Sequence, residues 1–178
     1  QQITPGYVRT DLGGTPPRGV DFHVWGRRPW MFAPSDGTTT YSGFACFGSL
    51  DDSAATWNLP YTFNFLNFGR PGAAANVLGA EKFKDHLVAF TENNIFPIYQ
   101  TPNAQLPFAF QDDLLNERGG GPVNIQSVVY ADGKLWWISQ NSDVKVMLPS
   151  KEIKSIGFPV RPFLKGIKDV CQQPFEER

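Results

Sequence analysis

The sequence predicts an α+β fold, in which a mainly antiparallel β-sheet packs with one amphipathic helix and a second short helix, joined by long ordered loops. Short runs rich in Val, Ile, Tyr, Phe and Trp recur between turn residues, which is typical of antiparallel strands. One segment, Ala73 to Thr91, has a helical period instead. The 178 residues fit one domain. We assign residues 1–17 to an extended N-terminal arm and 18–178 to a single globular domain.

The strongest strand signal is the segment from Val123 to Met147. Its two apolar runs flank Ala131-Asp132-Gly133, and Asp-Gly is favoured in two-residue hairpins because both central residues of a type I′ turn need positive φ. A third strand, Val144 to Leu148, follows. Adjacent Trp136 and Trp137 must point to opposite faces of the sheet.

Other segments are also predicted to be extended. Between Gly19 and Phe32 the residues alternate with the two-residue period of a half-buried strand. One face carries Val20, Phe22 and Val24, and the other carries Asp21, His23 and Trp25. The remaining strand segments are Thr38 to Phe47, Trp57 to Phe68, Ile95 to Tyr99 and Lys151 to Val160.

Two helices complete the predicted fold. From Ala73 to Thr91, apolar residues recur at three- and four-residue steps, at Ala73, Val77, Ala80, Phe83, Leu87 and Phe90. Gly79 costs such a helix about 1 kcal/mol relative to Ala, which a close packing contact would explain. The second helix is Asp112 to Arg118, with Asp112 as its cap and three glycines as its end.

Composition argues against several functional classes. The net charge is −1 and the basic residues are dispersed, so we expect no nucleic-acid partner. No run of 18 apolar residues is present, so we expect no direct membrane insertion. The His and Cys spacings match no metal site, and the glycine run lacks a phosphate-binding Lys-Ser/Thr, so we expect no metal and no cofactor. Cys46 and Cys171 are either paired or two separate thiols.

One set of residues offers the parts of a nucleophilic site. His23 lies two positions after Asp21 on the same strand face, and Ser35 and Asp36 stand in the following turn. A Ser-His-Asp site needs the serine within hydrogen-bond reach of a histidine that an acid orients. No G-x-S-x-G elbow marks Ser35 as a nucleophile. The alternative is a surface histidine satisfied by its neighbours.

A second set of residues suits ligand binding. Trp25 and Trp30 flank Arg27 and Arg28, and exposed Trp with Arg nearby is typical of surfaces that bind sugar rings or proteins. The alternative is that a second layer of the fold covers these aromatic side chains.

The chain also resembles the protruding domain of insect RNA-virus capsid proteins, as in the iflaviruses that infect bees. The resemblance rests on Thr4-Pro5-Gly6-Tyr7, Gly13-Gly14, Val24-Trp25 and the segment from Gly69-Arg70-Pro71 to Phe90. It implies a small α+β surface domain joined to a jelly-roll shell. Some family members carry an Asp-His-Ser cluster with adjacent His and Ser, but here His23 is followed by Val24.

These observations favour a non-enzymatic viral capsid surface domain that attaches to a host receptor or glycan during entry. Its expected partners are that receptor or glycan and other capsid subunits, and its expected location is the virion surface. One alternative is a hydrolase that acts through His23, Ser35 and Asp36. The other is a free-standing, secreted, lectin-like binding protein.

Overall fold

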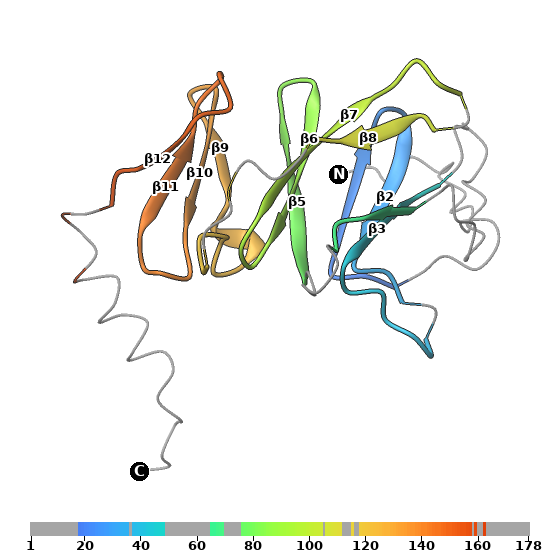
Figure 1. Cartoon of the computed structure of the whole chain (residues 1–178), viewed down its shortest axis with the longest axis horizontal. Helices are drawn as coiled ribbons and strands as arrows, with labels where there is room; N and C mark the ends of the chain where they lie inside the picture. The colour runs from blue at the N-terminus through green and yellow to red at the C-terminus, as the bar shows by residue number, and fades with distance from the viewer. Residues whose placement is uncertain are drawn as a thin grey trace, which may run out of the picture.

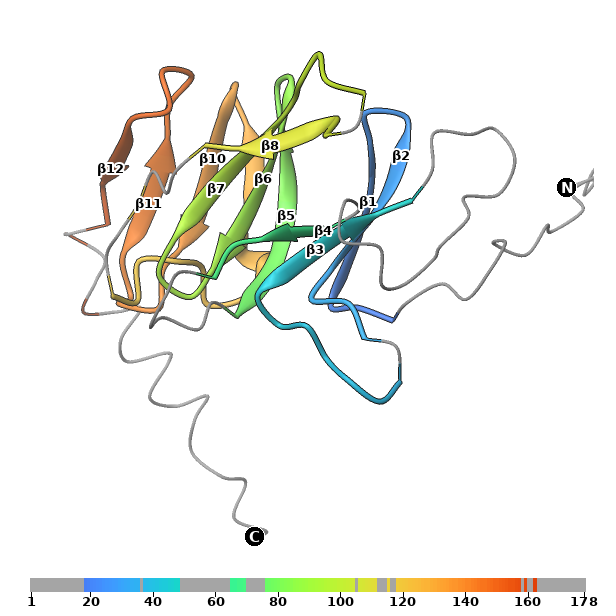
Figure 2. The same ribbon diagram turned by 45° about the vertical axis from the view of Figure 1, so that its right-hand side comes forward.

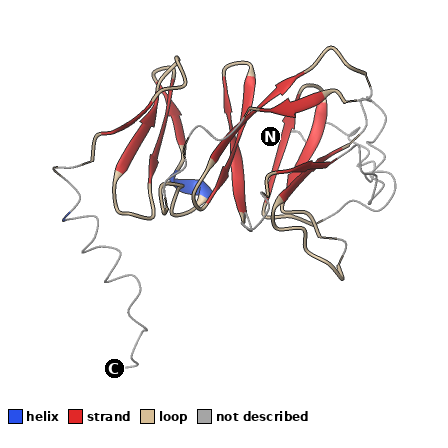
Figure 3. Ribbon diagram, in the orientation of Figure 1, coloured by secondary structure: helices blue, strands red, loops and turns tan. Residues whose placement is uncertain are grey.

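The described part of the chain forms three antiparallel β-sheets of four strands each (Figure 1). The structure, a computed structural model, describes residues 18–35, 37–48, 65–69, 76–104, 106–111, 115, 118–157, 159 and 162. Within these ranges the elements are strands and one short 3-10 turn, η2 (Ile125–Ser127), as Figure 3 shows. The predicted α+β class is therefore wrong, and the fold is nearly all antiparallel β.

Each sheet consists of four strands that follow one another in the sequence. Sheet 1 contains β1 (Asp21–Trp25), β2 (Arg28–Phe32), β3 (Phe44–Phe47) and β4 (Phe65–Asn67). Sheet 2 contains β5 (Val77–Phe83), β6 (His86–Thr91), β7 (Ile95–Gln100) and β8 (Phe108–Phe110). Sheet 3 contains β9 (Val129–Ala131), β10 (Lys134–Ile138), β11 (Val144–Met147) and β12 (Ile153–Ser155).

The three sheets stand side by side, with sheet 2 in the middle (Figures 1 and 2). The first strands are neighbours, because β1 and β9 both contact β5. Successive four-stranded meanders whose first strands meet in this way are the repeating units of β-propellers, called blades. The described chain is thus an arc of three blade-like sheets.

Two hydrophobic clusters hold the arc together. The cluster between sheets 1 and 2 contains Trp30, Phe32, Ala45, Phe47, Phe68, Val77, Ala80, Leu87, Ala89, Phe96, Ile98 and Phe108, among others. The cluster between sheets 2 and 3 contains Phe83, Val88, Phe90, Ile95, Val128, Leu135, Trp137 and Met147. Residues of β6 alternate between the two clusters, so both faces of sheet 2 are buried.

The segment predicted as an amphipathic helix is instead the β5–β6 hairpin, turning at Lys84, whose φ is 52°. The four consecutive residues Leu87 to Phe90 are all fully buried. A strand covered on both faces does not alternate between apolar and polar residues. Its apolar residues can therefore recur at the three- and four-residue spacing that is typical of an amphipathic helix. Ala73 to Ala75 lie outside the described residues, as does most of the second predicted helix, Asp112 to Arg118.

The local turn predictions agree well with the structure. Asp132 and Gly133 have φ of 51° and 71°, as a type I′ turn requires, and they join β9 to β10. Trp137 is buried, whereas Trp136 lies on the opposite face of the sheet. The predicted strand Gly19 to Phe32 divides into β1 and β2. The predicted N-terminal arm, 1–17, lies outside the described residues.

The face of β1 that turns inward is the one that carries Asp21, His23 and Trp25, while Val20, Phe22 and Val24 are exposed. Inside the arc, Asp21 reaches a β-bulge between Val77 and Gly79. Gly79 has a φ of 144°, and a Cβ there would lie 2.6 Å from Asp21 Oδ2 and 2.7 Å from Ile125 Cγ1. The sequence suggested a close packing contact at Gly79 within a helix. The contact exists, but Gly79 lies at a β-bulge.

Replacement of Gly79 by Ala should therefore destabilise the fold strongly. We expect Gly79→Ala to lower the free energy of unfolding by about 2–4 kcal/mol, from backbone strain and overpacking together. Gly133→Ala is the matched control, because Gly133 also has positive φ but nothing lies within 4 Å of its added Cβ. It should cost about 1 kcal/mol. Equal losses in urea denaturation would contradict this account of the bulge.

Candidate functional site

The β1–β2 turn presents two arginines at one end of sheet 1. Gly26 and Arg27 are its central residues, with φ of 59° and 60°, so the turn has the type I′ signature. A non-glycine residue in this conformation is strained by about 1–2 kcal/mol. The turn nevertheless exposes Arg27 and directs Arg28 along the sheet.

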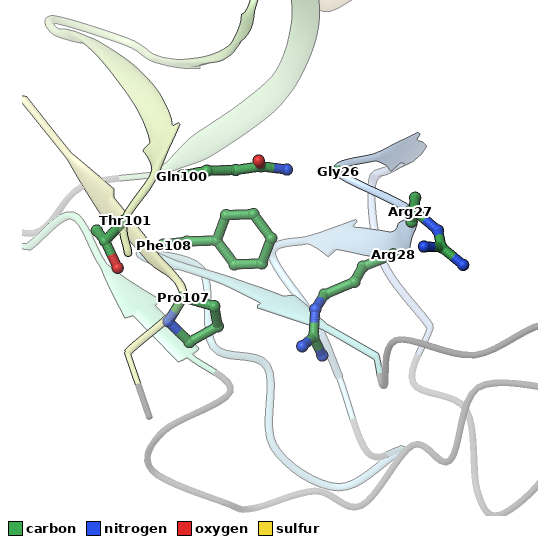
Figure 4. A pocket seen from close by; sticks show the side chains of 7 residues that line it. All are labelled: Gly26, Arg27, Arg28, Gln100, Thr101, Pro107 and Phe108. Atoms are coloured by element: carbon green, nitrogen blue, oxygen red, sulfur yellow. The ribbon is translucent and has the colours of Figure 1, made fainter. Parts of the chain in front are cut away.

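The β7–β8 connection lies against this turn and completes a pocket of about 310 Å³ (Figure 4). Its lining residues are Gly26, Arg27, Arg28, Gln100, Thr101, Pro107 and Phe108. The approach is close, since a Cβ on Gly26 would lie 2.5 Å from Gln100 Nε2 and 3.1 Å from Phe108 Cε1. A side chain at this position would therefore force Gln100 to move and press on the ring of Phe108.

Arg28 forms a fixed, charged wall of the pocket. Its Nη1 donates to the carbonyl of Gly48 at 2.9 Å, and its Cζ lies 5.6 Å and 5.9 Å from the ring centres of Phe47 and Phe108. Its Nε is shielded from solvent and has no hydrogen-bond partner among the residues that the structure describes. Burial lowers the pKa of Arg28, but a guanidinium stays protonated at neutral pH.

The pocket combines the Arg28 guanidinium with an amide and an aromatic ring, and Arg27 stands at its rim with its guanidinium directed away from Phe108 (Figure 4). Guanidinium groups bind carboxylates through paired, charge-assisted hydrogen bonds. The Gln100 side chain can donate or accept, and the ring of Phe108 offers an apolar surface. This combination suits a small anionic ligand with an apolar face.

Sequence reasoning found part of this pocket, because it selected Arg27 and Arg28. It missed Gln100 and Phe108, because no local pattern shows that their loop packs against the β1–β2 turn.

The two tryptophans that were predicted to bind ligand together with the arginines pack against Phe108, a residue that lines the pocket. Trp30 is fully buried, its Nε1 donates to the carbonyl of Trp25 at 3.1 Å, and its ring lies 4.7 Å from that of Phe108. Trp25 is half-buried, with its ring 5.4 Å from that of Phe108. Neither tryptophan lines the pocket. The alternative to ligand binding by these two residues was that another layer of the fold covers their side chains.

His23 and Asp21 form a pair on the inner face of β1. His23 Nε2 lies 3.1 Å from Asp21 Oδ2, which also accepts the backbone N–H of Ala80 at 2.8 Å. Burial would raise the pKa of Asp21, but the hydrogen bonds from His23 and from the backbone hold it below 3.8. The hydrogen bond to Asp21 raises the pKa of His23 above 6.5 against the opposing effect of burial.

Ser35 does not join this pair. His23 pairs with Trp30, and Arg18 bridges to Ser35 in the same antiparallel register, so the two side chains lie roughly 16 Å apart along the strands. The Ser35 hydroxyl accepts instead from the backbone of Gly37. Asp36 lies outside the described residues. The structure therefore brings Asp21 to His23, but not Ser35.

Other chemistry-bearing groups are dispersed. Within the described ranges, no group of three or more His, Cys, Asp or Glu side chains is placed to hold a metal ion. No helix in that part of the chain has the length and apolar character needed to cross a membrane. Cys46 is a free thiol whose burial raises its pKa to about 12, so it is mostly protonated at neutral pH. Cys171 lies outside the described residues.

The two histidines should affect stability with opposite pH dependence. Because folding raises the pKa of His23, its pair with Asp21 stabilises fully below about pH 6.5 and fades as pH rises through the raised pKa. His23→Gln should therefore lose more stability, relative to wild type, at about pH 5.5 than at about pH 8. The measurement is urea denaturation across this range.

His86 provides the control for this experiment. Burial, with the charge of Lys151, lowers the pKa of His86, so wild type loses stability as pH falls below about 6.5. His86→Gln should remove that loss and gain relative to wild type at low pH. The same pH trend for both variants would contradict the assigned Asp21–His23 pair.

We compared the chain with known proteins to look for relatives of this site. No protein-family model matches it, and no curated protein sequence is significantly similar to it.

Proposed function

We propose that this chain is a non-catalytic binding module that recognises a carboxylate-bearing ligand, such as an acidic sugar on a host glycan or receptor. The observation that carries the proposal is the pocket between the β1–β2 turn and the β7–β8 connection, which is lined by Arg27 and Arg28. In the proposed setting the module is displayed on the surface of a virus particle and serves attachment.

The pocket favours an acidic ligand over a neutral one. Arg28 is held in place by the Gly48 carbonyl and two aromatic rings, so little side-chain entropy is lost when it binds an anion. Arg27 is exposed and free to close over the ligand from the rim. A sugar acid offers a carboxylate for the guanidinium groups and an apolar ring face for Phe108.

The geometry supports binding better than catalysis. Among the described residues, those that line the pocket include no Ser, Cys, His or carboxylate, and the Thr101 hydroxyl is already bonded to the Leu106 carbonyl. The hydrolase alternative needs a nucleophile beside His23, and Ser35 lies at the other end of the hairpin. We therefore do not pursue it.

The viral setting depends on the resemblance to protruding capsid domains. The α+β domain that this resemblance implied is not the observed fold, so the proposal takes from it only the location and the capsid partners. A free-standing lectin-like protein would use the same pocket and differ in setting alone.

Removal of one rim charge should test the pocket directly. We expect the purified chain to bind acidic glycans on an array in preference to neutral ones of the same backbone. Arg27→Gln should weaken this binding by about 10–100-fold, the usual effect of losing a charge-assisted hydrogen bond. Titration of the best glycan by calorimetry measures the loss.

Arg18→Gln is the matched control. Arg18 is also exposed, but it lies outside the pocket, at the far end of the β1–β2 hairpin. Its loss should leave binding unchanged. Equal binding to acidic and neutral glycans, or equal effects of the two variants, would refute an anion-binding pocket.

A further inference from the structure

The side-chain amide of Gln100 is the polar group that faces Arg28 across the pocket. Figure 4 shows the ring of Phe108 between this amide and the guanidinium of Arg28. Gln100 is exposed, and within the part of the chain that the structure describes no hydrogen bond occupies its amide. The amide is therefore open to a ligand whose carboxylate is held by Arg28.

Gln100 and Phe108 form one unit of the pocket wall. They stand directly opposite each other in the antiparallel register of β7 and β8, so their side chains project from the same face with Cβ atoms about 4.5–5.5 Å apart. The position that a Cβ on Gly26 would take lies 2.5 Å from Gln100 Nε2 and 3.1 Å from Phe108 Cε1. A group that can donate or accept a hydrogen bond therefore stands beside the edge of an apolar ring.

The apolar surface beside the amide is small. Phe108 is only 6% exposed, because the rings of Trp30 and Phe47 pack on it at centre distances of 4.7 Å and 4.9 Å. Its contact with a ligand is therefore limited to a group of about the size of a methyl.

We propose that the ligand of this pocket is a sugar acid that carries an acetamido group, and that Gln100 determines this specificity. The inference rests on the proposed function, since it needs the carboxylate to be held at Arg28. An acetamido group joins a methyl to an amide, as the pocket wall joins Phe108 to Gln100. Its N–H can donate to Gln100 Oε1, or its carbonyl can accept from Gln100 Nε2, while its methyl lies on Phe108.

The two ends of the pocket select different parts of such a sugar. A hydroxyl in place of the acetamido group could still hydrogen-bond to Gln100, but it would bring no methyl to Phe108. A sugar without a carboxylate would leave the charge of Arg28 without a counter-charge. The pocket volume of about 310 Å³ is at the lower end for ligand sites, which suits one terminal sugar.

A pair of sugar acids tests the specificity. They are the methyl glycoside of N-acetylneuraminic acid, whose carboxylate and acetamido group stand on opposite sides of the sugar ring, and its analogue with a hydroxyl in place of the acetamido group. The wild-type chain should bind the first about 10–30-fold more tightly, the combined effect of one hydrogen bond and one buried methyl. NMR titration measures both affinities through the amide signals, which also report whether the chain is folded.

Replacement of Gln100 tests its role. Gln100→Leu keeps the size of the side chain and breaks no hydrogen bond among the described residues, so the fold should persist. We expect it to weaken binding of the N-acetylneuraminic acid glycoside by about tenfold. Gln126→Leu is the matched control, because Gln126 is also exposed but lies in η2, outside the pocket. It should leave the affinity unchanged.

A third sugar separates this inference from the proposed function. The methyl glycoside of N-acetylglucosamine has the acetamido group but no carboxylate, and it should bind more weakly than either sugar acid. If the two sugar acids bind equally and both exceed N-acetylglucosamine, the acidic pocket stands and the acetamido specificity is wrong. An unchanged affinity of Gln100→Leu would overturn the role of Gln100. If N-acetylglucosamine binds as tightly as the sugar acids, or if none of the three binds, the proposed function fails and this inference fails with it.

Discussion

The carboxylate of Asp21 is the interaction on which the arrangement of sheets 1 and 2 depends. It accepts the backbone N–H of Ala80, in β5, at 2.8 Å, and its Oδ2 lies 3.1 Å from His23 Nε2. The Gly79 bulge makes room for it. An ionised carboxylate that is half-buried needs several such donors to offset its loss of hydration. The contact therefore sets the relative position of the first strands of the two sheets.

The pocket is a consequence of that arrangement. Its two loops belong to different sheets, so they meet only if the two sheets keep a fixed relative position. The residues that stabilise the cluster between the sheets also shape the pocket: Trp30 and Phe47 pack on Phe108, and Phe108 lines the pocket beside Arg28. The pocket and the stability of the fold thus depend on one aromatic cluster. A rigid wall behind an exposed arginine is what a preorganised anion site requires.

Burial of both faces of sheet 2 accounts for the error in the predicted fold. It removes the polar alternation that identifies a strand, so the β5–β6 hairpin has the sequence pattern of a helix. In sheet 3 the alternation of the strand places Trp136 and Trp137 on opposite faces, with Trp137 in the core.

Local backbone chemistry was readable from the sequence, and partners distant along the chain were not. The turn at Asp132-Gly133 was predictable because its φ values depend on two adjacent residues. The proximity of Arg27 and Arg28 was equally visible, as neighbours in one turn. Whether Leu87 to Phe90 form a helix or a strand, and which loop covers the arginines, was decided by packing against other sheets. Those contacts join residues far apart in the chain, and no local pattern encodes them.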